Sequence, residues 1–172
     1  MTRLDPGAFW EFSLAYYSRE RVSAACLSLQ NRRGADVNIL LFCCWLATLN
    51  LKVEPGGLHA AIAAVEAWRR DVLEPLRSAR RAVADQFPEI AKSDRQSIKH
   101  GALSVELECE RVAQEKIALS ATGGGAAGVV AVEDGSTPLQ LASAALETYL
   151  DMVVGAPDDQ DAEDLKALLE PL

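Results

Sequence analysis

The residues with the clearest chemical potential are three arginines, Arg70, Arg77 and Arg81. On an uninterrupted α-helix they would project within about 40° of one another, so that three guanidinium groups share one face. Such a face could bind a phosphate or a carboxylate. Glu66, Asp71 and Glu74 lie beside the arginines and could instead form surface ion pairs with them, which contribute little to stability. In a third alternative the arginines pair with acids of a neighbouring helix. The candidates there are Glu106, Glu108 and Glu110.

A second candidate site would draw side chains from distant parts of the chain. Trp10, Tyr17 and Asn38, together with Arg77, have the chemistry to line a pocket that combines ring surfaces with hydrogen-bonding groups. No spacing connects these residues, so only the fold can bring them together. They belong to the interpretation that the protein is a helical enzyme or a small-molecule-binding protein with an anion-binding pocket.

The segment Gly123-Gly124-Gly125-Ala126-Ala127-Gly128 satisfies the pattern G-x-G-x-x-G. In dinucleotide-binding proteins a strand precedes this loop and a helix follows it, so that backbone N–H groups meet a pyrophosphate. Here a predicted helix precedes the glycines and valines follow them. We therefore interpret residues 122–137 as a glycine-rich loop between helices, with room for a short extended piece, and expect no cofactor.

Metal ligation and thiol catalysis have little support from the spacing of the cysteines and histidines. The chain contains no C-x-x-C or H-x-x-x-H pair, and its two histidines are isolated. We expect no metal site, and we expect the cysteines to be reduced and buried. The residues concerned are Cys26, Cys43, Cys44, Cys109, His59 and His100.

Acidic residues are concentrated in the C-terminal segment, residues 157–172. Aspartate clusters bind Mg²⁺ and diphosphate in helical prenyl-transferring enzymes, but those ligands sit on long helices inside a deep bundle. This cluster follows Gly155 and Pro157 near the end of the chain, so we predict a solvated cap. Its acids are Asp158, Asp159, Asp161, Glu163 and Asp164.

The element that must position all of these groups is a helix over about residues 37–50. Asp36 is a suitable N-cap, and from Ile39 to Ala47 no residue requires water. A helix that is apolar on every side must be surrounded by other elements, so we predict that it is the centre of the domain. The apolar run is about half the ~20 residues that a membrane span requires.

Two long helices are predicted beyond this centre, over about residues 58–86 and 93–121. Their apolar residues recur at steps of three and four, which is typical of an antiparallel pair in a bundle. Pro75 should kink or divide the first of them near Val72. Two shorter helices precede the centre, opened by Asp5-Pro6 and closed by Gly34. Helices are also predicted after Pro138 and over residues 161–169.

The composition limits the partners. With 25 acidic against 17 basic residues the net charge is −8, which argues against nucleic acid because phosphate binding requires a concentrated positive surface. The first residues carry Arg3 and Asp5, and no apolar segment with a cleavage site follows them. We therefore expect no secretory signal and a cytoplasmic location.

Three stretches of the N-terminal third carry a resemblance to a known family. They are Phe9-Trp10-Glu11-Phe12-Ser13-Leu14 with Tyr17, then Ala25-Cys26-Leu27-Ser28-Leu29-Gln30, then Asp36-Val37-Asn38 with Leu40-Leu41-Phe42-Cys43 and Trp45. In these the chain resembles a bacterial, mainly proteobacterial, family of conserved hypothetical helical proteins, a domain of unknown function. Pro75-Leu76-Arg77 and Glu106-Leu107 fit the same pattern. The resemblance implies a bacterial, cytoplasmic, helical protein and supplies no activity.

The sequence thus predicts one all-α domain over residues 1–172, a helical bundle with a buried central helix and an antiparallel pair of long helices. No paired catalytic acids, metal-binding spacing or phosphate loop with the right neighbours is present. We therefore expect a small non-enzymatic interaction or regulatory protein, whose partner is another protein or a second copy of the chain.

Overall fold

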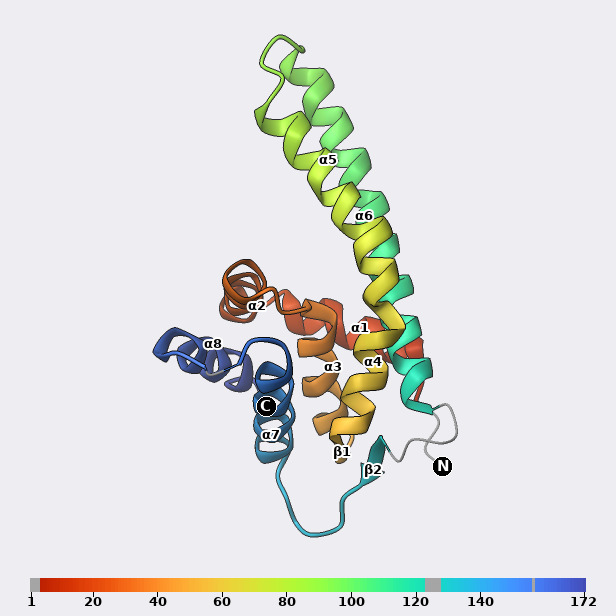
Figure 1. Cartoon of the computed structure of the whole chain (residues 1–172), viewed down its shortest axis with the longest axis vertical. Helices are drawn as coiled ribbons and strands as arrows, with labels where there is room; N and C mark the ends of the chain where they lie inside the picture. The colour runs from red at the N-terminus through yellow and green to blue at the C-terminus, as the bar shows by residue number, and fades with distance from the viewer. Residues whose placement is uncertain (1–3, 123–127, 156) are drawn as a thin grey trace.

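The computed structural model describes residues 4–122, 128–155 and 157–172, and it is helical apart from one small sheet. Figure 1 shows a body of short helices at one end and two long helices that run far beyond it. The order of elements is α1 (Pro6–Tyr17), α2 (Glu20–Arg33), α3 (Val37–Thr48), β1 (Leu51–Val53), α4 (Pro55–Trp68), η1 (Arg69–Leu73), α5 (Glu74–Asp85), α6 (Lys92–Thr122), β2 (Val129–Ala131), α7 (Pro138–Val153) and α8 (Asp159–Leu169).

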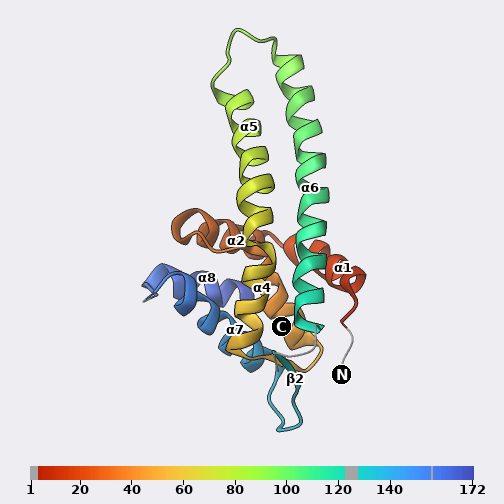
Figure 2. The ribbon, with the colours of Figure 1, turned by 45° about the vertical axis from the view of Figure 1, so that its right-hand side comes forward.

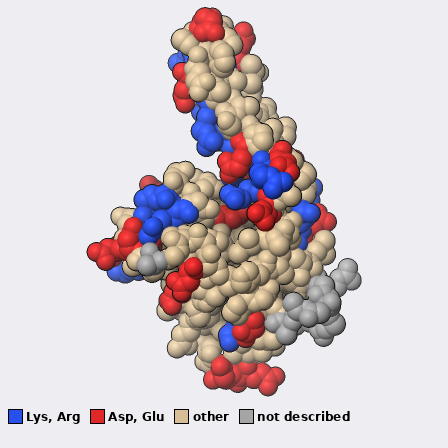
Figure 3. Space-filling view, viewed as in Figure 1, with Lys and Arg blue, Asp and Glu red and all other residues tan. Residues whose placement is uncertain are grey.

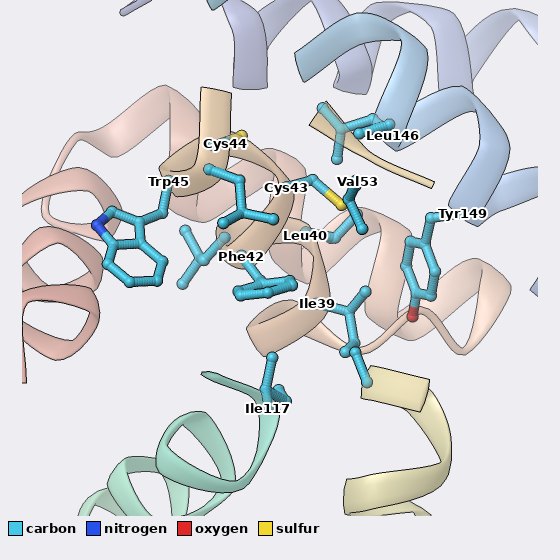
Figure 4. Packing of buried hydrophobic residues seen from close by; sticks show 14 of the residues in the cluster. Ile39, Leu40, Phe42, Cys43, Cys44, Trp45, Val53, Ile117, Leu146 and Tyr149 are labelled. Carbon is cyan, nitrogen blue, oxygen red and sulfur yellow. The ribbon is translucent and has the colours of Figure 1, made fainter. Parts of the chain in front are cut away.

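Helix α3 is the predicted centre of the domain. Every residue from Asn38 to Ala47 is buried, and the Asp36 carboxylate caps the helix by accepting from the Asn38 N–H at 2.8 Å. Trp45 stacks on Phe9 of α1, with ring centroids 4.9 Å apart. Figure 4 shows core side chains leaving α3 on several sides, toward α1, α6 and α7. The fold is therefore built around a helix that has no exposed face, as its composition predicts.

The N-terminal helices begin and end where the sequence predicts. The Asp5 side chain accepts from the Gly7 N–H at 2.9 Å, with Pro6 at the first helical position of α1. Gly34 ends α2 with φ 71°, a left-handed conformation that glycine adopts without steric cost. The short turn that follows brings the chain directly to the Asp36 cap.

Helices α4, η1 and α5 form one continuous run that begins at Pro55 and packs antiparallel against α6. The disturbance predicted near Val72 is a π-helical segment, η1, at Arg69–Leu73. Pro75 cannot donate a hydrogen bond to the Asp71 carbonyl four residues earlier, and an inserted residue relieves the resulting conflict. In Figure 2 the outer parts of α5 and α6 stand clear of every other element.

A two-stranded antiparallel ladder joins β1 to β2, with Leu51 opposite Ala131 and Val53 opposite Val129. The short extended piece foreseen in the glycine-rich loop is β2, whereas the prediction contained no strand at β1. Gly57 of α4 lies so close to this ladder that a Cβ on it would sit 2.4 Å from the Gly128 carbonyl oxygen. Only glycine fits that approach.

Two capped helices complete the domain. In α7 the Thr137 side chain accepts from the Gln140 N–H, and in α8 the Asp158 side chain accepts from the Asp161 N–H. Helix α7 packs on α3, while α8 packs on α2. Among the described residues, no helix is both long enough and apolar enough to cross a bilayer.

Candidate functional site

A polar cluster, buried at Asn38 and Gln114 and partly buried at Arg77 and Glu110, lies where the long hairpin joins the body. The Asn38 amide nitrogen donates to Glu110 Oε2, and Arg77 Nη2 donates to Glu110 Oε1. The Gln114 amide nitrogen donates to Asn38 Oδ1 at 3.0 Å, and Arg77 Nη1 donates to Glu74 at 3.2 Å. We call Asn38, Arg77, Glu110 and Gln114 the hairpin-root cluster. It connects α3, α5 and α6.

Burial sets the electrostatics of this cluster. It raises the pKa of Glu110 above its ordinary value, although the Arg77 guanidinium and the Asn38 amide act in the opposite direction. Both oxygens of Glu110 already accept hydrogen bonds, and Arg77 is held by two carboxylates. The cluster therefore has the properties of a fixed joint between hairpin and body rather than those of an open anion site.

Tyr17 lies beside this cluster and Trp10 does not take part in it. Burial raises the pKa of the Tyr17 hydroxyl, with a further contribution from the nearby Glu110 carboxylate, while Arg77 lowers it. Trp10 is half-buried on α1, seven residues earlier. The structure thus brings together three of the four residues predicted for a pocket, Tyr17, Asn38 and Arg77, and they pack around Glu110.

The three arginines of the predicted stripe do not converge. Arg70 is exposed and donates to the adjacent Asp71, at 2.7 and 2.8 Å, while Arg81 is exposed and forms no ion pair with any described residue. Only Arg77 enters the hairpin-root cluster. The predicted common face assumed a regular helix, and η1 adds a residue between Arg70 and Arg77, which rotates one relative to the other by about 100°.

The alternative of pairing with the neighbouring helix describes one of the contacts, Arg77 with Glu110. Arg80, which lies outside the predicted stripe, donates to Glu106 at 2.6 Å. Glu106 is buried, so its pair with Arg80 is not an exposed surface pair of the second alternative. That alternative does describe the pair of Arg77 with the partly exposed Glu74, at 3.2 Å. Glu108 instead pairs with Arg111 on its own helix at 3.1 Å. The i, i+3 spacing of Arg77 and Arg80 places both side chains on one face of α5, and this was the signal in the sequence for their pairing with α6.

The predicted solvated cap at the C-terminus is wrong for its central acids. Asp161 is fully buried and Asp164 is nearly so. Arg32 donates to both carboxylates at 2.9 Å, and Arg33 Nε donates to Asp161 at 2.8 Å. The pKa of Asp161 is lowered, chiefly by the Arg33 hydrogen bond. These acids attach α8 to α2, and they face a basic pair at the end of α2 rather than solvent.

The other motifs have little chemistry in the part of the chain that the structure describes. Residues 123–127 of the G-x-G-x-x-G pattern lie outside the described residues, while the Gly128 carbonyl accepts from the Glu54 N–H at 2.8 Å. No group of three or more His, Cys, Asp or Glu side chains among the described residues could hold a metal. The four cysteines are free thiols; three are buried, as predicted, and Cys109 is partly exposed.

The most prominent exposed feature is the outer part of the hairpin, which we define as residues 79–107 and call the outer hairpin. Phe87 is exposed at its tip. Ile98 and Val105 of α6 are 49 and 50% exposed and lie seven residues apart, so they share a helix face; Leu103 and Leu107 are exposed on another. In Figure 3 acidic and basic side chains gather where the hairpin meets the body.

Residues 8–117 match the model of a family described as Protein of unknown function (DUF2390). No curated protein and no solved structure gives a match. The matched range covers well over half of the chain and runs from α1 into α6. It includes α3, the outer hairpin and the whole hairpin-root cluster.

Proposed function

Because the chain belongs to the family described as Protein of unknown function (DUF2390), which names no activity, we propose a function from the structure itself. We propose that it is a non-enzymatic interaction protein of the bacterial cytoplasm that contacts another protein through its outer hairpin. The observation that carries the proposal is that the outer hairpin leaves several large apolar side chains exposed, with Ile98 and Val105 on one face of α6.

The spacing of those side chains supports a helical contact. Ile98 and Val105 are one heptad apart, which is the spacing at which one helix face meets a partner over successive turns. Both stand about half exposed on a hairpin that no other element covers in either ribbon view. No residue of α5, all of which is described, is fully buried. Large apolar side chains grouped on one exposed element are typical of protein-interaction sites.

The root of the hairpin is built to hold that surface in a fixed direction. Arg77 and Arg80 connect α5 to Glu110 and Glu106 of α6. The Trp68 indole N–H donates to the Cys109 carbonyl at 3.0 Å, which ties α4 to α6. A surface that is ordered before it binds loses less conformational entropy on association, so a rigid root favours recognition.

The test is site-specific photocrosslinking in an extract of the source cells. A photoreactive amino acid at position 105 should form a discrete adduct with one protein, and a second substitution, Ile98→Asp, should abolish that adduct. The same photoreactive group at the exposed position 116, nearer the body on α6, is the control and should not give the adduct. The captured protein, made separately, should then bind the unmodified chain in solution.

Three results would overturn the proposal: no adduct at position 105, an equal adduct at 116, or no binding in solution. Because Ile98 and Val105 are half exposed, the substitutions should leave helical content unchanged, and circular dichroism checks this. Mass spectrometry of the adduct also distinguishes a different protein from a second copy of the chain.

A further inference from the structure

A partly enclosed hollow of about 250 Å³ lies on the body, between the start of α3, the α4–η1 junction and α7. Its apolar lining residues come from three helices: Ile39, Ile62, Val65 and Val153. Its polar groups are Asp36, Glu66, Arg69 and Tyr149. An apolar hollow with a few convergent polar groups is the usual form of a small-molecule site. None of these four polar residues belongs to the hairpin-root cluster or the outer hairpin.

Two hydrogen-bond donors in this hollow lack a close acceptor. The Tyr149 hydroxyl oxygen accepts from the Asp36 N–H at 2.7 Å, but its own proton has no acceptor among the described residues. Burial raises the pKa of Tyr149, so the hydroxyl keeps its proton. Arg69 is 40% exposed, and its one ion pair among the described residues is with Glu74 at 4.0 Å. Figure 4 shows the Tyr149 hydroxyl pointing toward the segment that precedes α3.

The acceptor in the hollow is the Asp36 carboxylate. It accepts from the Asn38 N–H at 2.8 Å, which uses only part of its hydrogen-bonding capacity. Burial raises the pKa of Asp36, while the Asn38 N–H and the nearby positive charges of Arg69 and Arg77 lower it, and the Glu66 carboxylate also lines the hollow. A positive group, Arg69, and a negative group, Asp36, therefore line the same small space.

We propose that this hollow binds a small zwitterion of the apolar α-amino acid class. The ligand carboxylate would accept from Arg69 and from the Tyr149 hydroxyl, its ammonium would donate to Asp36, and its aliphatic chain would contact the apolar walls. A plain carboxylate would meet the charge of Asp36, and a plain amine would meet Arg69, so each is disfavoured by one of the two groups. A hollow of about 250 Å³ lies just below the usual size range of small-molecule sites, which suits a ligand this small.

The backbone at this place is also unusual. Arg69 is the first residue of η1, and π-helical segments are frequent at functional sites. The Arg69 side chain lines the hollow from this segment.

Calorimetric titration of the full chain with L-leucine tests the proposal. Isocaproate has the same skeleton without the amine, and isoamylamine has it without the carboxylate. We expect saturable binding of leucine, and binding of each analogue weaker by about tenfold or more. Arg69→Met should weaken leucine binding by at least a similar factor. Arg70→Met is the matched control, since Arg70 is the next residue, is exposed and pairs with Asp71, and it should leave binding unchanged.

Tyr149→Phe should also weaken binding, but it removes the acceptor of the Asp36 N–H and could affect folding. Arg69→Met is therefore the deciding variant, because the Arg69 side chain is partly exposed and its one ion pair among the described residues, with Glu74, is long at 4.0 Å. The proposal is overturned if leucine and the other small apolar amino acids, valine and isoleucine, show no saturable binding at millimolar concentration. It is equally overturned if isocaproate binds as well as leucine, or if Arg69→Met and Arg70→Met bind alike.

Discussion

Arg33, at the end of α2, holds Asp161 of α8 across 128 positions of the sequence. Its Nε donates to both carboxylate oxygens, at 3.1 and 2.8 Å, and its Nη2 donates to Oδ2 as well. Asp161 has no exposed surface. A buried carboxylate held by a planar guanidinium is a strong, oriented contact, and here it fixes the C-terminal helix to the body.

Asp161→Asn should therefore destabilise the protein. The change leaves Arg33 and Arg32 without their shared carboxylate, and we expect a loss of about 2–4 kcal/mol in the free energy of unfolding, measured with urea. Asp159→Asn, on the exposed side of the same helix turn, is the control and should change it by less than about 0.5 kcal/mol. Equal effects of the two variants would contradict the buried role of Asp161.

The same contact predicts a response to acid. The native pKa of Asp161 lies below its ordinary value of 3.8, so its contribution is complete above that pH and is lost as the pH falls toward the native pKa. The stability difference between the wild type and Asp161→Asn should therefore shrink as the pH is lowered below about 3.8. A stability difference that stays constant as the pH falls would show that the ionised carboxylate of Asp161 is not what stabilises the contact between α8 and α2.

Glu110 predicts the opposite dependence. Its native pKa is raised above the ordinary value of 4.5, so ionisation in the folded state costs stability as the pH rises through 4.5 to the native pKa. Glu110→Gln removes that cost, and its stability relative to the wild type should improve from below pH 4.5 to neutral pH. Urea unfolding at several pH values measures this, with Glu108→Gln on the exposed face of α6 as control. A decline instead would mean that the Arg77 ion pair outweighs burial.

Arg77→Ala distinguishes a joint from an anion site. Removing Arg77 leaves Glu110 buried without its cation, so we expect a loss of about 2–4 kcal/mol, more than an exposed pair would give. Arg81→Ala, at an exposed position, should have little effect on stability.

A ligand test separates the two interpretations of Arg77. If Arg77 bound an anionic ligand, phosphate or a nucleotide at 100 times its Kd would stabilise the fold by about 2.7 kcal/mol. On our interpretation melting curves show no Arg77-dependent rise with any anionic metabolite.

Two adjacent glycines provide a test of the contact between α4 and the ladder. Gly57→Ala would place a Cβ 2.4 Å from the Gly128 carbonyl oxygen, whereas Gly56→Ala meets nothing within 4 Å. We expect Gly57→Ala to lower the free energy of unfolding by about 1–3 kcal/mol and Gly56→Ala to leave it unchanged or slightly raised. Thermal melting compares them. Similar melting temperatures would mean that the ladder shifts freely away from α4.

Trp45 tests the central position of α3. It is 3% exposed and stacks on Phe9, so Trp45→Ala should cost about 3–5 kcal/mol. Trp10→Ala removes a half-buried indole from α1 and should cost clearly less. Chemical denaturation of both variants measures the difference. A Trp45→Ala protein that unfolds at nearly the wild-type denaturant concentration would place the centre of the fold elsewhere.

Much of the fold follows from local signals. The run from Ile39 to Ala47 predicted a buried helix because a helix without a polar face has no stable place at the surface. The spacing of three and four residues in the long helices predicted their antiparallel pairing, because an apolar stripe along a helix is stabilised when another helix covers it. The strand β1 was missed because it is three residues long and its partner lies some 80 residues later, so no local pattern distinguishes it from a turn.

The polar contacts were harder to predict because charge patterns do not specify partners. Asp161 looked like part of a solvated segment since its arginines lie far away in sequence. The prediction that Arg70, Arg77 and Arg81 share a face holds only for a regular helix. The π-helical segment at Arg69–Leu73 changes which arginines share a face. The pairing of Arg77 with the acids of α6 was one of the alternatives. The pairing of Arg80 with Glu106 was not, because Arg80 lies outside the predicted stripe.

The ladder between β1 and β2 also brings together the two ends of the chain segment that contains the long hairpin. Val53 and Val129 are register partners, so the chain that departs toward α4 and the chain that follows α6 are neighbours. A segment whose two ends are adjacent behaves as a module: it can be lengthened or shortened without displacing what it is attached to. If both helices change by whole heptads, the reach of the hairpin changes by about 10 Å per heptad while its exposed face keeps its direction.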